Sequence, residues 1–269
     1  MNAATGRLGK AILGSYFGLM IIFLYVPLVV LVVFAFNNAY IPTLPLSGFT
    51  TRWFHAAFAN TDLTGALKRS AWLALLNGIA ATILGLPAAI AITGRKLFLR
   101  SVWTTLLLLP LVVPYIVLAI GMVIVIHQLG FQASLTAVLA GHIVISLPYA
   151  LLVIVPRLRT LDASIVEAAR DLGAGTFSAF MLVTLPLLVP ALISSVLICF
   201  TISFDEFAIA SFLAPPDAPT YPVFLYSGTR TPALEPQVIA LGAIVITLSI
   251  VLVVGAEVSR RVLEHRLAT

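Results

Sequence analysis

Two carboxylates lie next to each other inside an otherwise apolar stretch of the chain. The stretch runs from Leu187 to Ala214, and Asp205 and Glu206 interrupt it within the sequence SFDEF. Ionisable side chains inside an apolar, membrane-length segment usually face a cavity or a charged partner. Three interpretations stay open: a station for a cationic solute, a helix end at the membrane interface, or a salt bridge to another subunit. Because neighbouring residues of a helix point about 100° apart, we expect one acid to face a path, and Asp205 is the candidate.

The other polar side chains within apolar segments are scattered. His142 and Tyr149 are seven residues apart on one helical face, and Tyr149 is a further candidate for a substrate path. A lone histidine in a helix bundle is more often an interhelical hydrogen-bonding residue than a ligand. The four histidines lack metal-ligand spacing, and no group of residues indicates hydrolysis. We therefore expect no enzymatic activity, no metal and no cofactor in this chain.

The segment 157–186 separates two apolar stretches and has helix signals of its own. Asp162 can accept backbone N–H bonds as an N-cap, which predicts a helix from Ala163. Gly173 can take the left-handed conformation that ends a helix. A second short helix is predicted from about Thr176, and Pro186 marks the start of the next apolar segment. Two short helices joined by a glycine turn, with an apolar face too large to leave wet, should dock on something.

The same segment contains a spaced pattern. Glu-Ala-Ala at 167–169 is followed by three residues and Gly173, and nine residues later by the aliphatic Val183. One further residue leads to Leu185 and Pro186. An ordinary amphipathic connector between two apolar helices needs no such spacing.

Composition places these segments in a membrane. Of the 269 residues, 61% are hydrophobic and 9% are charged, against about 25% charged in soluble domains. The single cysteine, Cys199, excludes an internal disulfide and is expected to be a small buried apolar residue. The basic residues form no patch for nucleic acid. Six stretches are long enough to span a bilayer, near 13–36, 70–94, 102–126, 134–156, 187–206 and 238–258.

The basic residues predict the orientation of these spans. With the N-terminus in the cytoplasm, an even number of spans returns the C-terminus there as well. The external side of the membrane then holds only Arg52, Lys68, Arg69 and Arg230. The cytoplasmic side holds Arg7, Lys10, Arg95, Lys96, Arg100, Arg157, Arg159, Arg170, Arg260, Arg261 and Arg266. This bias indicates that the loop 157–186 is cytoplasmic, whereas 37–69 and 207–237 are external.

The pattern at 167–186 resembles the signature of the membrane subunits of ABC importers, usually written EAA…G…I.LP, with Val183 in place of isoleucine. The resemblance covers nearly the whole chain. GFTTRWF at 48–54, EAARDLGA at 167–174 and SFDEF at 203–207 are similar to polyamine-type permeases, in particular the second permease of spermidine/putrescine importers.

The resemblance implies an all-α membrane protein with the type I ABC importer permease fold, as one permease domain over 1–269. The loop between the fourth and fifth spans would be the coupling helices, which insert into a groove of a cytoplasmic ATPase. The positions expected to serve this coupling are Glu167, Ala168, Ala169, Arg170, Gly173, Leu185 and Pro186. ATP and Mg²⁺ would bind a separate chain, because Gly9-Lys10 is followed by Ala11 and is not a phosphate loop.

The implied assembly contains two ATPase copies, a second permease and a periplasmic or lipid-anchored solute-binding protein in a bacterial inner membrane. A heterodimer of permeases is favoured, and a homodimer is open. Polyamine is the first candidate solute; opines, amino-acid derivatives, ferric ion and thiamine use related permeases. Two other classes are less well supported: a self-powered secondary transporter, whose paired repeats are not visible here, and a membrane enzyme, which needs a polar catalytic cluster.

Overall fold

The computed structural model describes residues 3–94, 97–228, 234–247 and 250, and these ranges are helical apart from loops and one isolated bridge between Asn37 and Phe49. The chain forms two compact units, residues 1–64 with 225–269, and residues 65–224. The elements are α1 Ala3–Ala35, α2 Arg52–Ala59, α3 Thr61–Thr93, α4 Arg100–Leu108, η1 Leu109–Leu111, α5 Tyr115–Gln128, α6 Leu135–Thr160, α7 Ala163–Asp171, α8 Thr176–Ala179, η2 Phe180–Thr184, α9 Leu185–Phe204, α10 Ala208–Leu213, α11 Tyr221–Gly228, and a helix Glu235–Thr247. The single permease domain over 1–269 stays a prediction.

Four of the described helical segments are long and apolar enough to cross a membrane. They are Ile12–Ala35, Thr61–Thr93, Leu135–Thr160 and Thr176–Phe204. These segments correspond to the first, second, fourth and fifth predicted spans. The fifth begins earlier than expected, because α8, the π-helical turn η2 and α9 follow one another without a break. The predicted second short helix is therefore the first turn of a longer helical segment.

The third predicted span, 102–126, is a bent pair. Arg100–Leu111 and Tyr115–Gln128 meet at an angle of 103°. Pro110 lies in η1, and Pro114 is the N-cap of α5. Proline donates no backbone hydrogen bond and disfavours helical geometry in the residue before it, so two prolines four residues apart interrupt the helix. If the bent pair counts as one span, the described residues contain five.

The sixth predicted span, 238–258, is described only in part. A shorter apolar helix covers Glu235–Thr247. The rest of that span, the predicted cytoplasmic C-terminus and the basic residues Arg95, Lys96, Arg230, Arg260, Arg261 and Arg266 lie outside the described residues.

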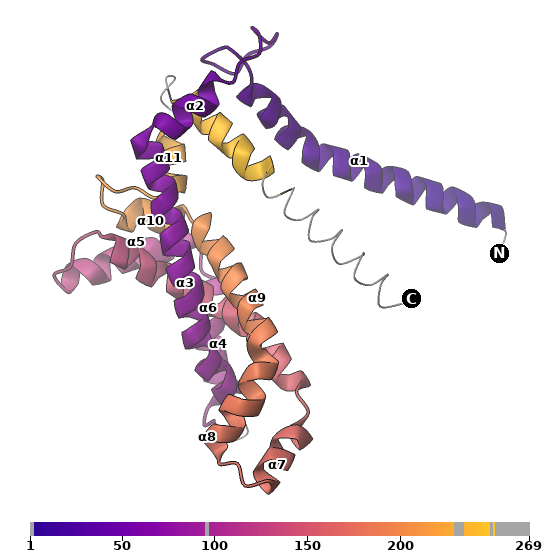
Figure 1. The fold of residues 1–269 in the computed structure, drawn as a ribbon, viewed down its shortest axis with the longest axis vertical. Coiled ribbons are helices and arrows are strands. Elements are labelled where there is room, and N and C mark those ends of the chain that lie inside the picture. The colour runs from indigo at the N-terminus through magenta and orange to yellow at the C-terminus, as the bar shows by residue number, and fades with distance from the viewer. Residues whose placement is uncertain (1–2, 95–96, 229–233, 248–249, 251–269) are drawn as a thin grey trace. The chain divides into compact units, whose positions relative to one another are not determined.

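Residues 65–224 are built around three helices that pack closely. Figure 1 shows α3 and α9 side by side, and α6 packs along α9. A Cβ on Gly78 of α3 would lie 2.6 Å from the carbonyl oxygen of Val196 in α9, and one on Gly85 would lie 2.9 Å from the Cβ of Ala150 in α6. Small residues allow helices to approach this closely. The resulting van der Waals contacts stabilise helix packing in lipid, where the hydrophobic effect between helices is absent.

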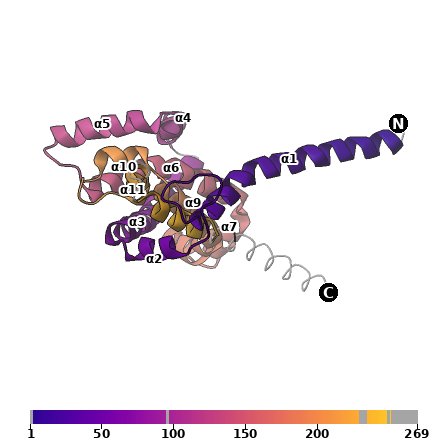
Figure 2. The same ribbon diagram turned by 90° about the horizontal axis from the view of Figure 1, so that it is seen from above.

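A second close contact holds the short helix α10 in the same unit. α10 packs against α5 and α6. A Cβ on Gly141 of α6 would lie 2.6 Å from Cγ2 of Ile209, the second residue of α10. Ile209, Ala210 and Leu213 are buried in one apolar cluster with Ile145. In Figure 2, which views the ribbon from above, α10 lies between α5 and α6.

In the other unit, the loop after α1 is ordered by side-chain contacts. The Oδ1 atom of Asn37 accepts hydrogen bonds from the backbone N–H (3.0 Å) and the hydroxyl (3.1 Å) of Ser47. The indole N–H of the buried Trp53 donates to the carbonyl of Asn37 over 2.8 Å. The guanidinium of Arg52 stacks on Trp53, with its Cζ 4.1 Å from the ring centre. The predicted external segment therefore has a defined structure around α2.

Candidate functional site

The elbow, defined as residues 162–179, begins with the predicted N-cap. The carboxylate of Asp162 accepts a hydrogen bond of 2.9 Å from the backbone N–H of Ser164, and α7 starts at Ala163. This hydrogen bond holds the pKa of the exposed Asp162 carboxyl below its ordinary value, because it stabilises the ionised form. The N-cap predicted from the sequence is confirmed.

The end of α7 depends on Gly173, which has a φ of +91°. Its backbone N–H donates to the carbonyl of Arg170 over 2.8 Å, and the N–H of Ala174 donates to the carbonyl of Ala169 over 3.0 Å. This pair of bonds is the Schellman arrangement, which satisfies the last carbonyls of a helix and turns the chain sharply. A residue with a side chain is strained at that φ, which explains the glycine at this position of the pattern.

The elbow presents apolar side chains to its surroundings. Leu172 is 90% exposed and Phe177 is 72% exposed, and they flank the glycine turn. Ile165 is exposed as well, and so is Leu182 in η2, just after the elbow. Apolar groups on a turn at the end of two long helices have no core to join, so the surface they form is suited to contact with another chain.

The predicted coupling residues lie close together at this end of the unit. Glu167, Ala168 and Arg170 are exposed on α7, and Ala169 is half-buried. Glu167 and Arg170 line a cavity of about 520 Å³ beneath α7, together with Thr93, Arg159 and Thr184. Figure 1 shows α7 and α8 together at the end of the unit away from α10.

Leu185 and Pro186 are the first two residues of α9, which the π-helical turn η2 joins to the elbow. Pro186 is in the first turn of α9, directly after the π-helical turn Phe180–Thr184. Proline cannot make the usual hydrogen bond to the preceding turn, and the wider π-turn accommodates its ring. Arg157 of α6 bonds to the first turn of α9, because its Nε and Nη2 atoms donate to the carbonyl of Leu187 over 3.3 and 3.2 Å. The elbow is thus held on both α6 and α9.

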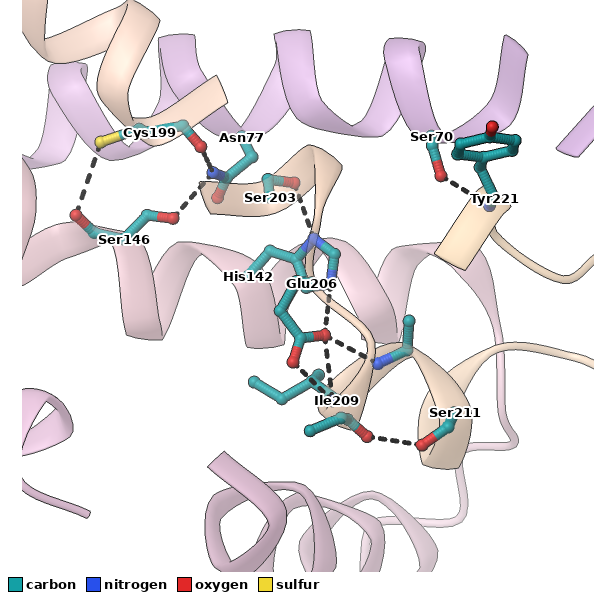
Figure 3. Close-up of polar contacts among 12 residues, drawn as sticks. Ser70, Asn77, His142, Ser146, Cys199, Ser203, Glu206, Ile209, Ser211 and Tyr221 are labelled. Carbon is teal, nitrogen blue, oxygen red and sulfur yellow. Dashed lines mark hydrogen bonds and ion pairs between the residues drawn. The ribbon is translucent and has the colours of Figure 1, made fainter. Parts of the chain in front are cut away.

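At the far end of α9 lies the acid junction, defined as Glu206, His142, Ser203 and the first residues of α10 (Figure 3). The Glu206 carboxylate accepts hydrogen bonds of 2.9 to 3.0 Å from the backbone N–H groups of Ile209 and Ala210. It lies 3.2 Å from Nε2 of His142, whose Nδ1 is 2.7 Å from the hydroxyl of Ser203. All three side chains are buried. His142 therefore makes the interhelical hydrogen bond that the sequence favoured.

The two neighbouring acids have different surroundings. Asp205 is the C-cap of α9 and is exposed, whereas Glu206 is 5% exposed. Among the described residues, none donates a hydrogen bond to the Asp205 carboxylate. Glu206 is occupied by the first turn of α10 and by His142, so it holds the break between α9 and α10 in place. Of the two acids, Asp205 is the one with a carboxylate open to a solute.

Further buried polar contacts join the three central helices. The side-chain amide of Asn77 donates to the hydroxyl of Ser146 (2.8 Å) and to the carbonyl of Cys199 (2.9 Å), as Figure 3 shows. The hydroxyls of Tyr149 and Tyr115 lie 3.2 Å apart, so Tyr149 contacts α5. Tyr149, Asp205 and Glu206 as substrate-path residues stay predictions.

Sequence reasoning did not anticipate these pairings. Asn77 and His142 are both polar residues in apolar segments, but their partners, Ser146 and Ser203, are types that occur throughout the chain. The nearest signal was the break that Asp205 and Glu206 make in an apolar run, which marks the short loop between α9 and α10.

Comparison with known proteins identifies the class of this helical membrane protein. The family model described as "Binding-protein-dependent transport system inner membrane component" matches residues 81–268. The chain belongs to this family of multi-pass membrane permeases.

The relatives belong to polyamine systems. The chain is 29% identical over 254 residues to the spermidine/putrescine transport system permease protein PotC of Escherichia coli strain K12, covering 94% of this chain and 96% of the relative. It is 33% identical over 231 residues to the putrescine transport system permease protein PotI of the same strain, covering 83% and 82%. PotC of Haemophilus influenzae is 31% identical over 243 residues, covering 90% and 94%.

Two solved structures share the fold. One is a bacterial ABC transporter involved in the import of the acidic polysaccharide alginate, with a TM-score of 0.73 at 15% identity, covering 97% of this chain and 98% of that one. The other is a bacterial alginate ABC transporter in complex with an alginate pentasaccharide-bound periplasmic protein, with a TM-score of 0.70 at 21% identity and 96% coverage of both. At these identities the likeness concerns the fold alone.

Proposed function

We propose that this chain is a permease subunit of an ATP-driven importer that moves a small cation, first of all a polyamine, into the cytoplasm. A separate cytoplasmic ATPase docks on the elbow, and its closure shifts α6 and α9 between inward-open and outward-open arrangements. ATP and Mg²⁺ bind in that ATPase and not in this chain. A second permease, a second ATPase copy and a solute-binding protein outside the membrane complete the importer, in a bacterial inner membrane.

The observation that carries the proposal is the geometry of the elbow. α7 begins at a side-chain cap and ends at a Schellman turn, so it is a stiff unit with Leu172 and Phe177 exposed beside the turn. Arg157 and the unbroken passage from α8 into α9 attach that unit to two long helices. A force applied to α7 is therefore transmitted to α6 and α9. An ATPase can shift the permease between two states only if its contacts with the elbow differ between them.

The orientation of the elbow is tested with one added cysteine at a time. Cys199 is buried and inert, so Leu172→Cys and Phe49→Cys each introduce a single reactive thiol. A membrane-impermeant maleimide should label Leu172→Cys only in inverted vesicles and Phe49→Cys only in right-side-out vesicles. Labelling of Leu172→Cys from the outside would overturn the cytoplasmic elbow.

ATPase docking is tested by two matched charge reversals. Glu167 and Asp171 are both exposed acids on α7, but only Glu167 belongs to the spaced pattern. We expect Glu167→Lys to abolish copurification of the ATPase and uptake, while the protein still inserts. Asp171→Lys should retain both. Uptake by Glu167→Lys at the rate of the unchanged protein contradicts the proposed docking.

The choice of a cationic solute rests on Asp205 and on the names of the relatives. Asp205 is exposed at the end of α9 about 30 Å from the start of that helix, so it lies toward the predicted external side. Opines, amino-acid derivatives, ferric ion and thiamine stay as alternative cargoes.

Uptake in vesicles that contain the whole importer separates these cargoes. Asp205→Asn should weaken uptake of spermidine and putrescine, whereas Asp217→Asn, which changes an exposed acid in the loop after α10, should not. Unchanged polyamine uptake by Asp205→Asn would remove the acid from the path.

A further inference from the structure

Two adjoining cavities lie between α3, α4 and α6, outside the elbow surface and the acid junction. The first, about 260 Å³, is lined mainly by apolar side chains, among them Leu108, Leu151 and Val155. The second, about 320 Å³, is lined by Arg100, Arg159, Ser101, Thr104, Thr105 and Ile92. Ile92, Thr104 and Arg159 line both, so the apolar cavity opens into the basic one.

The basic cavity has the groups that recognise a phosphate. Arg100 and Arg159 are exposed, and among the described residues no carboxylate forms an ion pair with either. Guanidinium groups bind phosphate through paired hydrogen bonds. The hydroxyls of Ser101 and Thr105 can add further donors, whereas that of Thr104 donates to the carbonyl of Arg100 over 2.8 Å. Arg157, two residues from Arg159, is already bonded to the carbonyl of Leu187.

The neighbouring cavity beneath α7 also includes Arg159, together with Arg170, but there the lining contains the carboxylates of Asp162 and Glu167 as well. The two carboxylates offset the two guanidinium groups there, whereas the lining next to Arg100 contains no carboxylate. The favourable place for a negative group is therefore on the α4 side of Arg159, next to Arg100.

The basic cavity lies at the start of α4 and the end of α6, a position that agrees with the level of lipid headgroups. Trp103 is 51% exposed three residues after Arg100 on α4, and α4 has no buried residue. Tryptophan is enriched where membrane meets water. Basic pockets between membrane helices on the cytoplasmic side bind anionic headgroups. On the orientation proposed above, the basic cavity opens at the cytoplasmic leaflet.

We infer that these cavities form a site for an anionic phospholipid, whose phosphate lies between Arg100 and Arg159 and whose acyl chain enters the apolar cavity. The site links α4 to the last turn of α6, from which the elbow continues. A bound lipid would thus restrict the motion of the last turn of α6, which carries the elbow. The inference depends on the proposed orientation and not on the identity of the cargo.

Quenching of Trp103 fluorescence by brominated lipids tests the inference on the assembled importer in detergent–lipid micelles. The Trp103→Phe variant supplies the signal of the other tryptophans for subtraction. Brominated phosphatidylglycerol should quench Trp103 more than brominated phosphatidylcholine at equal mole fraction. Arg100→Gln and Arg159→Gln should each lower this preference about fivefold. Lys10→Gln, which removes an exposed charge far along the chain in α1, should leave it unchanged.

Competition by millimolar inorganic phosphate distinguishes a lipid from a free anion. Phosphate should leave the preference for phosphatidylglycerol intact, whereas restored fluorescence would mean a phosphate site and overturn the lipid. Equal quenching by the two lipids in the unchanged importer would overturn the site altogether, including the case in which the second permease covers it. Uptake by the same importer preparations reconstituted into sealed vesicles is a separate readout, so loss of transport with an intact lipid preference contradicts the proposed function alone.

Discussion

The elbow and the acid junction lie at opposite ends of α9 and are built in opposite ways. In the elbow, the bonds that shape α7 join residues at most five apart, and most side chains are exposed. At the junction, His142 reaches Ser203 across 61 residues and the groups are buried. The shape of the elbow therefore depends on its own sequence and its surface stays exposed, whereas the polar groups of the junction hold helices together.

The difference predicts that changes at the junction act on stability and changes at the elbow act on docking. The largest expected effect is at Glu206. Glu206→Ala leaves His142 and two backbone N–H groups buried without their carboxylate, which should lower the free energy of unfolding by about 3–5 kcal/mol. Thermal unfolding of the purified protein in detergent measures it.

The neighbouring acid is the control for this change. Asp205→Ala removes an exposed carboxylate and should alter the free energy of unfolding by no more than about 0.5 kcal/mol. Equal losses for Glu206→Ala and Asp205→Ala would mean that the junction is no more structural than its surroundings.

A smaller loss is expected at Asn77, which joins three helices near the junction. Asn77→Ala leaves the Ser146 hydroxyl and the Cys199 carbonyl without their donor, at a cost of about 1–3 kcal/mol. The same unfolding measurement applies. Thr93→Ala, which removes a hydroxyl bonded within its own helix, should cost less; a result in the opposite order would contradict the role of Asn77.

At the elbow, Gly173→Ala should have a local effect. The left-handed backbone costs a residue with a Cβ about 1–2 kcal/mol, so the end of α7 should fray while the melting temperature stays unchanged. Faster amide hydrogen exchange at positions 173 and 174, with weaker ATPase copurification, is the expected result. Gly175→Ala is the matched control, because Gly175 has a φ of −64° that alanine adopts readily. If both variants behave alike, the Schellman turn is not what shapes the elbow.

The smallest effect is expected at Asp162. Asp162→Ala should speed amide exchange at Ser164 without changing global unfolding, because it removes one exposed cap. The pKa of Asp162 is lower in the folded state, so the cap is fully present above the ordinary aspartate pKa of about 3.9 and is lost as the pH falls through the lower folded value. If the Ser164 amide stays equally protected from hydrogen exchange in Asp162→Ala, the Asp162 cap does not stabilise the start of α7.

Much of the fold could be predicted because its causes are local. Apolar runs longer than a bilayer is thick indicated the first, second, fourth and fifth spans, and Asp162 and Gly173 indicated where α7 begins and ends. The third span was predicted as one stretch, and its break into two helices was not, although Pro110 and Pro114 are visible in the sequence. Prolines are tolerated in membrane helices, often as a fixed kink, and their effect depends on neighbouring helices. The passage from α8 into α9 was missed for a similar reason, since Pro186 ends a helix in most settings but is accommodated here by a π-turn.

By itself, the sequence determined that this chain crosses a membrane several times and has a capped, glycine-ended helix with the importer pattern, because hydropathy, caps and φ preferences act over a few residues. Only the tertiary structure decided which of two neighbouring acids is buried, which serines meet Asn77 and His142, and that Arg100 and Arg159 share a cavity. Those outcomes depend on how helices far apart in the sequence pack together, and no short pattern specifies that packing.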